Sequence, residues 1–152
     1  MVAYSVVDIF AGPGGLAEGF SRVPGGDGGR AFHIALSIEK EAAAHSTLLL
    51  RSFLRQFGDR LPEAYYRFIN ENGDEPNWSA LYPQQWAAAL GEAWKLELGG
   101  EDPETRLNSR LDEIRTESGG NVILIGGPPC QAYSLVGRAR NQGKEGYVAS
   151  KD

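Results

Sequence analysis

Residues 4–21 have the sequence YSVVDIFAGPGGLAEGFS, which predicts a strand, a glycine-rich turn and a short helix in immediate succession. Tyr4–Phe10 is short, apolar and rich in β-branched residues, as expected of a strand that is buried on both faces. Ala11–Gly15 supplies the turn and Leu16–Ser21 the helix. A strand that passes through glycines into a helix is typical of the first unit of a parallel α/β fold.

The rest of the chain continues this alternation of strands and helices. Further strands are expected at Phe32–Ile38, Lys95–Leu98 and Val122–Ile125, and helices at about 40–57, after Pro62, after Pro83 and from Pro103. The segment of about 59–94 is longer than an ordinary crossover and is interpreted as a helical insertion. The expected fold is therefore α/β, with a parallel sheet and helices on both of its faces.

The composition is that of one globular domain: 152 residues, of which 41% are apolar and 23% charged. No apolar run approaches the roughly 20 residues of a membrane span, and the N-terminus lacks the basic start of a signal peptide. A cytoplasmic location is expected, or a nuclear one in a eukaryote. The net charge of −5 argues against binding of nucleic acid by the whole surface but leaves room for a local basic loop. The single cysteine excludes an internal disulfide, and neither histidine has the spacing of a metal ligand.

The glycine-rich turn is a candidate ligand loop. Glycines let the backbone turn sharply and let a ligand approach closely, and the helix that follows favours a negative group such as a carboxylate. The spacing matches neither the dinucleotide pattern G-x-G-x-x-G nor a phosphate loop that ends in Lys-Ser/Thr, so pyrophosphate is not the expected ligand. Glu39, at the end of the second strand, is placed to accept hydrogen bonds from ribose hydroxyls. The alternative is that Glu39 only caps the helix that follows it.

The second motif is GGPPCQAYS at residues 126–134, which begins where the last predicted strand ends. Open α/β sheets bind their ligands at this carboxyl edge. The two prolines restrict the backbone before Cys130, which favours a positioned nucleophile over a core cysteine. Residues 138–144 carry three positive charges and no acid, which suits contacts with phosphates, although a solvated surface loop has the same composition.

Together and in this order, DIFAGPGG at 8–15 and GPPCQ at 127–131 resemble the motifs of the DNA cytosine carbon-5 methyltransferase family. The resemblance covers about the first 40 residues and the last 35. It implies an S-adenosylmethionine-dependent methyltransferase fold, Rossmann-like and incomplete. The chain, residues 1–152, would be the N-terminal part of the catalytic domain, with a mobile active-site loop at about 130–150.

The resemblance also assigns roles to individual residues. Cys130 would be the catalytic nucleophile, Asp8 would organise the glycine loop, and the adenine amino group would be bound by Glu97 or, less well matched, Asp112. The residues implied to bind S-adenosyl-L-methionine are Phe10, Ala11, Gly12, Gly14, Gly15, Leu16, Glu39 and Pro129, the last also beside the target base. Those implied to contact DNA are Gln131, Ser134, Arg138 and Arg140.

The activity implied is methyl transfer to carbon 5 of cytosine in double-stranded DNA through a covalent Cys130 adduct, as in restriction–modification systems. The family's Glu-Asn-Val and Gln-x-Arg-x-Arg motifs, its target-recognition domain and its last helix have no counterpart in the sequence. We therefore expect a fragment that is inactive alone and needs a C-terminal half, in the same chain or in a separate subunit. Apolar surface left open by the missing helix would favour self-association.

Three other functions fit part of the pattern. The chain could be a non-catalytic module that binds S-adenosylmethionine, although the Pro-Cys-Gln sequence at 129–131 argues against this. It could be a nucleotide-dependent oxidoreductase domain, although the dinucleotide glycine spacing is missing. Cys130 could be a redox sensor, which would need an intermolecular partner because the chain has no second cysteine.

Overall fold

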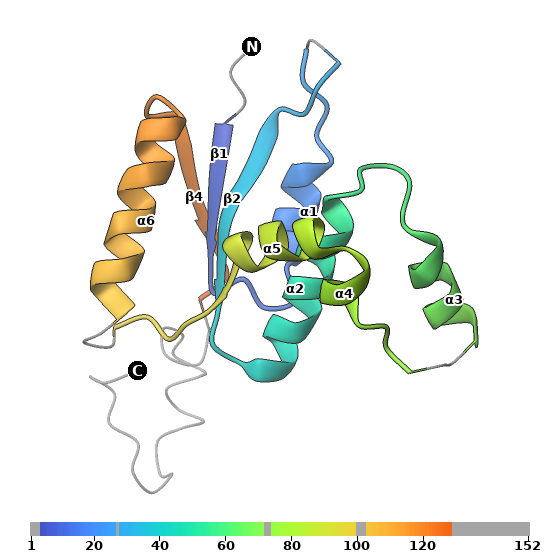
Figure 1. Cartoon of the computed structure of the whole chain (residues 1–152). Helices are drawn as coiled ribbons and strands as arrows, with labels where there is room; N and C mark the ends of the chain where they lie inside the picture. Colours follow the sequence, from blue (N-terminus) through green and yellow to red (C-terminus); the bar gives the residue numbers. More distant parts are fainter. Residues whose placement is uncertain (1–3, 27, 72–73, 100–102, 129–152) are drawn as a thin grey trace, which may run out of the picture.

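The computed structural model describes residues 4–26, 28–71, 74–99 and 103–128 (Figure 1). Four parallel strands form one sheet in the order β3-β2-β1-β4. The strands are β1 (Tyr4–Ile9), β2 (Phe32–Glu39), β3 (Ala93–Lys95) and β4 (Val122–Gly126). The chain places β1, β2 and β3 side by side toward one edge of the sheet and then returns to add β4 on the other side of β1. This strand order is that of Rossmann-type sheets. The predicted Rossmann-like parallel sheet with flanking helices is confirmed.

Helices cover both faces of the sheet. They are α1 (Gly15–Ser21), α2 (Ala42–Arg55), α3 (Glu63–Glu71), α4 (Trp78–Leu81), α5 (Pro83–Glu92) and α6 (Pro103–Glu117). Figure 1 shows α6 on one side of the sheet and α1, α2 and α5 on the other. Pro83 begins α5, where the missing N–H of proline has no cost, and the Asn77 side chain caps α4.

Alternate residues of β1 supply the two sides of the core. Val7 packs on one face with Leu36 of β2 and Ile114 of α6. Val6 packs on the other face with Ala17 of α1. Because β1 is covered on both sides, its near-continuous apolar sequence is explained by its central position.

The helical insertion builds a layer of its own against α2. Its centre is Phe53 of α2, which contacts the Trp78, Tyr82 and Trp86 rings at centroid distances of 5.2, 6.0 and 5.5 Å. Trp78 is buried and α3 packs against the same cluster. Trp78 and Trp86 are therefore packing residues of this layer.

Some boundaries differ from those expected. The third strand was predicted at Lys95–Leu98 but lies at Ala93–Lys95, because these residues pair with the end of β2. Phe10 was assigned to the first strand but has a φ of 55°, which ends β1 at Ile9. The helix expected at about 40–57 is shorter, since Glu41 is extended and the helix begins at Ala42.

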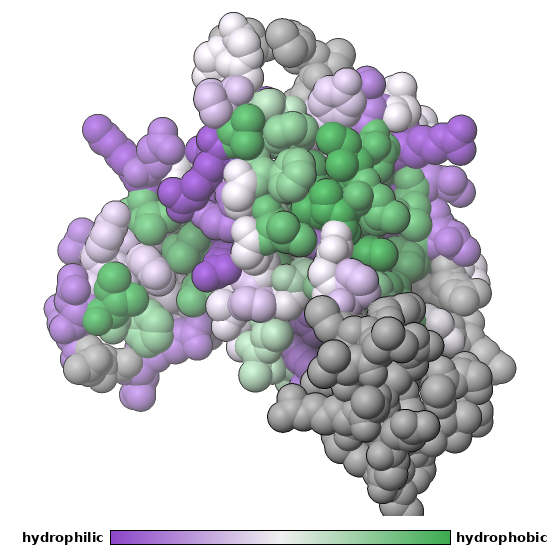
Figure 2. All heavy atoms as spheres, turned by 180° about the vertical axis from the view of Figure 1, so that it is seen from behind, coloured by the Kyte–Doolittle hydropathy of each residue, from purple (hydrophilic) through white to green (hydrophobic). Residues whose placement is uncertain are grey.

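The outer strand β4 leaves apolar surface open. Val122 and Leu124 are exposed by 37% and 65%. Apolar side chains gather in a broad area on the face of the molecule seen in Figure 2. Self-association through such a surface stays a prediction. In the described residues, no helix has both the length and the apolar character of a membrane span.

Candidate cofactor and active site

The loop between β1 and α1 lies at the carboxyl edge of the sheet and has an unusual backbone. Phe10, Gly12 and Gly14 have φ values of 55°, 56° and 85°. For phenylalanine this left-handed conformation costs about 1 kcal/mol, and residues held in this way cluster at functional sites. The loop is held by backbone hydrogen bonds from the Ala11 N–H to the Ile38 oxygen (2.9 Å) and from the Gly14 N–H to the Ala11 oxygen (3.0 Å).

Helix α2 supports the same loop from below. A Cβ atom on Gly14 would lie 2.8 Å from Cδ1 of Leu48, so only glycine fits there. Arg51, one turn further along α2, donates from Nη1 to the Pro13 oxygen at 3.0 Å. The α2 helix therefore fixes the position and the orientation of the loop.

Glu39 joins the glycine loop to the end of β2. Its Oε2 accepts the Gly12 N–H at 2.7 Å, and its Oε1 accepts the Glu41 N–H at 2.8 Å. The carboxylate therefore holds the loop and also binds the amide of Glu41, the residue directly before α2, rather than an amide of the first helical turn. Each carboxylate oxygen can accept a second hydrogen bond, so Glu39 retains the capacity to bind hydroxyl groups.

The other predicted cofactor residues take different positions in the loop. Phe10 and Leu16 are exposed by 37% and 47%. A Cβ on Gly12 or Gly15 would meet nothing within 4 Å, so their backbones face open space. The Ala11 side chain instead packs inward against the α2 helix, which leaves only its backbone for contact with a ligand.

The end of β4 meets the glycine loop. Gly126 pairs with Ile9, and a Cβ on Gly126 would lie 2.3 Å from the Ile9 oxygen. Gly127 follows next to Phe10, with 3.9 Å from a built Cβ to the Phe10 oxygen. The first residues of the Pro-Pro-Cys motif therefore leave the sheet directly beside the glycine loop. The remaining predicted site residues lie outside the described part of the chain: Pro129, Cys130, Gln131, Ser134, Arg138 and Arg140.

The two candidates for binding an adenine amino group lie in different places. Glu97 follows β3 near Glu39. The Leu96 N–H donates to the backbone oxygen of Glu39 at 3.1 Å, and Nζ of Lys40 lies 3.3 Å from Oε1 of Glu97. Asp112 belongs to α6 and shares a surface hollow with Gly119 and Gly120, which precede β4 at the opposite edge of the sheet. Of the two candidates for the adenine amino group, the geometry favours Glu97, which lies near Glu39, over Asp112.

Comparison with known proteins found a curated relative, which bears on the class of protein. The chain is 32% identical over 153 aligned positions to the type II methyltransferase M.Bpa9945I of Bacillus paralicheniformis. This similarity supports the assignment of the chain to a methyltransferase family. The alignment covers 89% of the chain and 32% of the relative, so the chain spans about a third of this curated relative's length. No family model matches the chain, and no solved structure matches it.

Asp8 lies beneath the loop that it was expected to organise. Its side chain is fully buried, and neither carboxylate oxygen has a hydrogen-bond partner of good geometry. Burial raises the pKa of Asp8, and the Ala17 amide and the Arg55 guanidinium only partly oppose this. Asp8 is therefore an acid whose ionised form is poorly compensated in the folded protein.

No pattern in the sequence predicted the ion pairs that surround Arg55. Its Nη1 lies 3.0 Å from Oε2 of Glu18 in α1, and its Nη2 contacts Glu92 at the end of α5. Burial alone would raise the pKa of Glu18, but hydrogen bonds from Arg22 and Arg55 outweigh it and lower this pKa. Partners 37 residues apart carry no local pattern, so only the folded arrangement could identify this cluster.

We expect Asp8→Asn to change the pH dependence of stability. Because the folded-state pKa of Asp8 lies above its unfolded value, the unfolded state loses its proton first and the wild type loses stability as the pH rises between the two values. The free energy of unfolding of Asp8→Asn should therefore gain on the wild type as the pH rises from about 4 toward neutrality. Urea unfolding at several pH values measures this, with exposed Asp112→Asn as control. Parallel curves for wild type and Asp8→Asn would contradict the prediction.

Proposed function

We propose that this chain forms the cofactor-binding and nucleophile-bearing part of a DNA cytosine carbon-5 methyltransferase. The observation that carries the proposal is the close approach of the β4 end to the glycine loop, with Gly126 against Ile9. The two sequence motifs thus start from neighbouring positions at one edge of the sheet, where open α/β folds bind ligands. The similarity to a type II methyltransferase supports the methyltransferase part of this proposal.

The described residues fit S-adenosyl-L-methionine as the cofactor. Glu39 would accept hydrogen bonds from the ribose hydroxyls with its remaining lone pairs. The open backbone at Gly12 and Gly15, followed by the start of α1, would receive the charged amino-acid end of the cofactor. The exposed Phe10 ring supplies an apolar wall, and Glu97 would accept from the adenine amino group. When bound, this cofactor supplies an electrophilic methyl group.

In this proposal, Cys130 activates the target base. Its thiolate would add to carbon 6 of cytosine, forming a sulfur–carbon bond and making carbon 5 nucleophilic enough to take the methyl group. Loss of the proton from carbon 5 would then expel the thiolate and restore the aromatic ring. The base must leave the double helix to reach Cys130. Gln131, Ser134, Arg138 and Arg140 would contact the backbone of the double-stranded DNA, and Pro129 would shape the space beside the base.

The remaining catalytic and target-recognition groups would come from a C-terminal half, in the same polypeptide or in a second subunit. The chain by itself is then expected to bind cofactor without transferring a methyl group. Cofactor binding can therefore be tested directly on the chain, separately from catalysis.

Calorimetric titration with S-adenosyl-L-homocysteine tests the cofactor site. We expect saturable binding to the 152-residue chain, and Glu39→Ala should weaken it at least about tenfold because hydrogen bonds to a charged group are lost. The matched control, Glu63→Ala, removes a carboxylate from α3 and should bind like the wild type. Thermal unfolding of each variant separates loss of binding from loss of fold.

The same titration distinguishes the competing functions. NAD should produce no binding heat, since the glycine spacing does not suit a pyrophosphate. Binding of NAD in preference to S-adenosyl-L-homocysteine would overturn the proposal and favour an oxidoreductase domain.

A further inference from the structure

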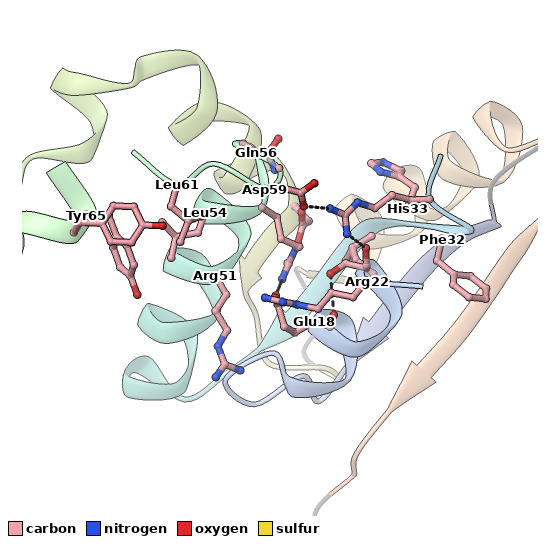
Figure 3. A pocket seen from close by; sticks show the side chains of 17 residues that line it. Glu18, Arg22, Phe32, His33, Arg51, Leu54, Gln56, Asp59, Leu61 and Tyr65 are labelled. Carbon is pink, nitrogen blue, oxygen red and sulfur yellow. Dashed lines mark hydrogen bonds and ion pairs between the residues drawn. The ribbon is translucent and has the colours of Figure 1, made fainter. Parts of the chain in front are cut away.

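A cavity lies between α1, α2, the start of β2 and the α3 helix (Figure 3), and of its lining residues Arg51 also contacts the glycine loop. Its volume is about 650 Å³, within the range of small-molecule sites. The first residues of β2, Phe32–Ile34, line it, whereas Glu39 ends that strand at the opposite edge of the sheet. The cavity is therefore a different site from the one assigned to the cofactor.

Arginines dominate the walls of this cavity. Arg22, Arg30, Arg51 and Arg55 all line it, against the acids Glu18, Asp59 and Glu92. Glu18 pairs with both Arg22 and Arg55, and Glu92 pairs with Arg55. Among the described residues, Arg51 has no acidic partner and bonds only to the Pro13 oxygen. One positive charge thus remains uncompensated, in a chain whose net charge is −5.

Arg22 and Arg30 have the most exposed acidic partners of the set, although Arg30 also donates to the Ser21 backbone oxygen. Arg30 meets Asp59 at 3.4 Å, but the Asp59 side chain is 99% exposed and such a pair contributes little. The Arg22 side chain is 75% exposed, and its pair with Glu18 is a surface i,i+4 pair, which also contributes little. Within the cavity wall, the buried Nε of Arg55 has no hydrogen-bond partner. An anion with several acceptor oxygens, such as a phosphate, matches this set of planar guanidinium donors.

The wall opposite these arginines is aromatic. Tyr65 and Tyr66 of α3 line the cavity with Leu61, and Figure 3 shows Tyr65 across the cavity from Arg22. The Tyr66 side chain is 43% exposed, so its ring is accessible for stacking. Arginine on one side and an accessible aromatic ring on the other suit a phosphate attached to a planar base.

We propose that this cavity binds a nucleotide unit, with the phosphate at Arg22 and Arg30 and the base against Tyr66. The unit would belong either to a free nucleotide or to a single-stranded segment of nucleic acid. The site does not depend on the cofactor assignment, because it uses none of the residues proposed to hold S-adenosylmethionine.

Titration of the whole chain with thymidine 5′-monophosphate, followed calorimetrically and by NMR shift mapping, tests this site. A pyrimidine nucleotide is chosen because it does not imitate the adenosine part of the cofactor. We expect Arg22→Gln to weaken binding about tenfold, as for the loss of one charge-assisted hydrogen bond, and Tyr66→Leu to weaken it as well. Arg110→Gln removes an arginine of similar pairing from α6, and Glu39→Ala alters the cofactor loop; neither should change the affinity.

The arms of the titration distinguish the source of the ligand. Thymidine without phosphate should bind far more weakly, and added salt should weaken binding of the nucleotide. If oligothymidylate binds more tightly than the mononucleotide, and Arg22→Gln removes this gain in affinity, the cavity is assigned to a nucleic-acid strand. If oligothymidylate binds more weakly than the mononucleotide, the cavity is assigned to a free nucleotide. The proposal is overturned if the nucleotide gives no saturable binding, or if its affinity is the same in Arg22→Gln and Tyr66→Leu as in the wild type.

Discussion

Cys130→Ser should abolish methyl transfer to DNA by the protein expressed from its complete gene. The proposed reaction needs a thiolate to add to the cytosine ring, and a serine hydroxyl at neutral pH supplies almost no alkoxide. Loss of a catalytic nucleophile typically lowers the rate by a factor on the order of 10⁴ or more. Incorporation of labelled methyl groups into DNA measures the rate, and Ser109→Ala on the exposed side of α6 is a control.

This substitution also identifies the target atom. Methylation of an exocyclic amino group of cytosine or adenine requires no bond between cysteine and the ring. DNA that contains 5-fluorocytosine should form a denaturation-resistant adduct with the wild type and none with Cys130→Ser. Retention of full methyl transfer by Cys130→Ser would reject the carbon-5 mechanism, while binding of S-adenosyl-L-homocysteine would still report on the cofactor site.

Gly126→Ala should strongly reduce the stability of the folded chain. The new Cβ would lie 2.3 Å from the Ile9 oxygen and 2.9 Å from Ile9 Cγ1. The first contact is with backbone, so relief requires β4 to move away from β1 at the point where both strands end. We expect a loss of about 3 kcal/mol in the free energy of unfolding, as for severe overpacking.

The neighbouring glycine provides a close control. A Cβ on Gly127 would meet only the Phe10 oxygen, at 3.9 Å, so Gly127→Ala should unfold within about a degree of the wild type. Thermal unfolding should place Gly126→Ala roughly 10 °C lower. Equal melting temperatures for the two variants would show that the end of β4 is not in contact with β1 as described.

The sequence predicted the fold well where the pattern was local. The apolar run of β1, the glycines after it and the alternation of strands and helices each follow from neighbouring residues. The third strand was misplaced because Leu96–Leu98 is as apolar as Ala93–Lys95, and only pairing with Ser37–Glu39 of β2 selects the latter. Such pairing depends on residues far apart in the chain.

The candidate site was predictable only in part, because its contacts also depend on residues far apart in the chain. Glu39 and Gly12 were both singled out, but the hydrogen bond between them spans 27 residues and emerged only from the structure. Arg51 carried no signal at all, because its contact with Pro13 depends on where α2 lies against the loop. Ala11 was expected to contact the cofactor; its side chain is part of the core, so this contact would be made by its backbone.

The hydrogen bond from Gly12 to Glu39 has a consequence for the entropy of association. It fixes the loop without any ligand, so the conformational freedom of residues 10–14 is already lost when the chain folds. A ligand that enters this site meets a preorganised surface and spends little of its interaction energy on ordering the protein. Association is then expected with only small backbone rearrangement, so that affinity is determined by the contacts themselves.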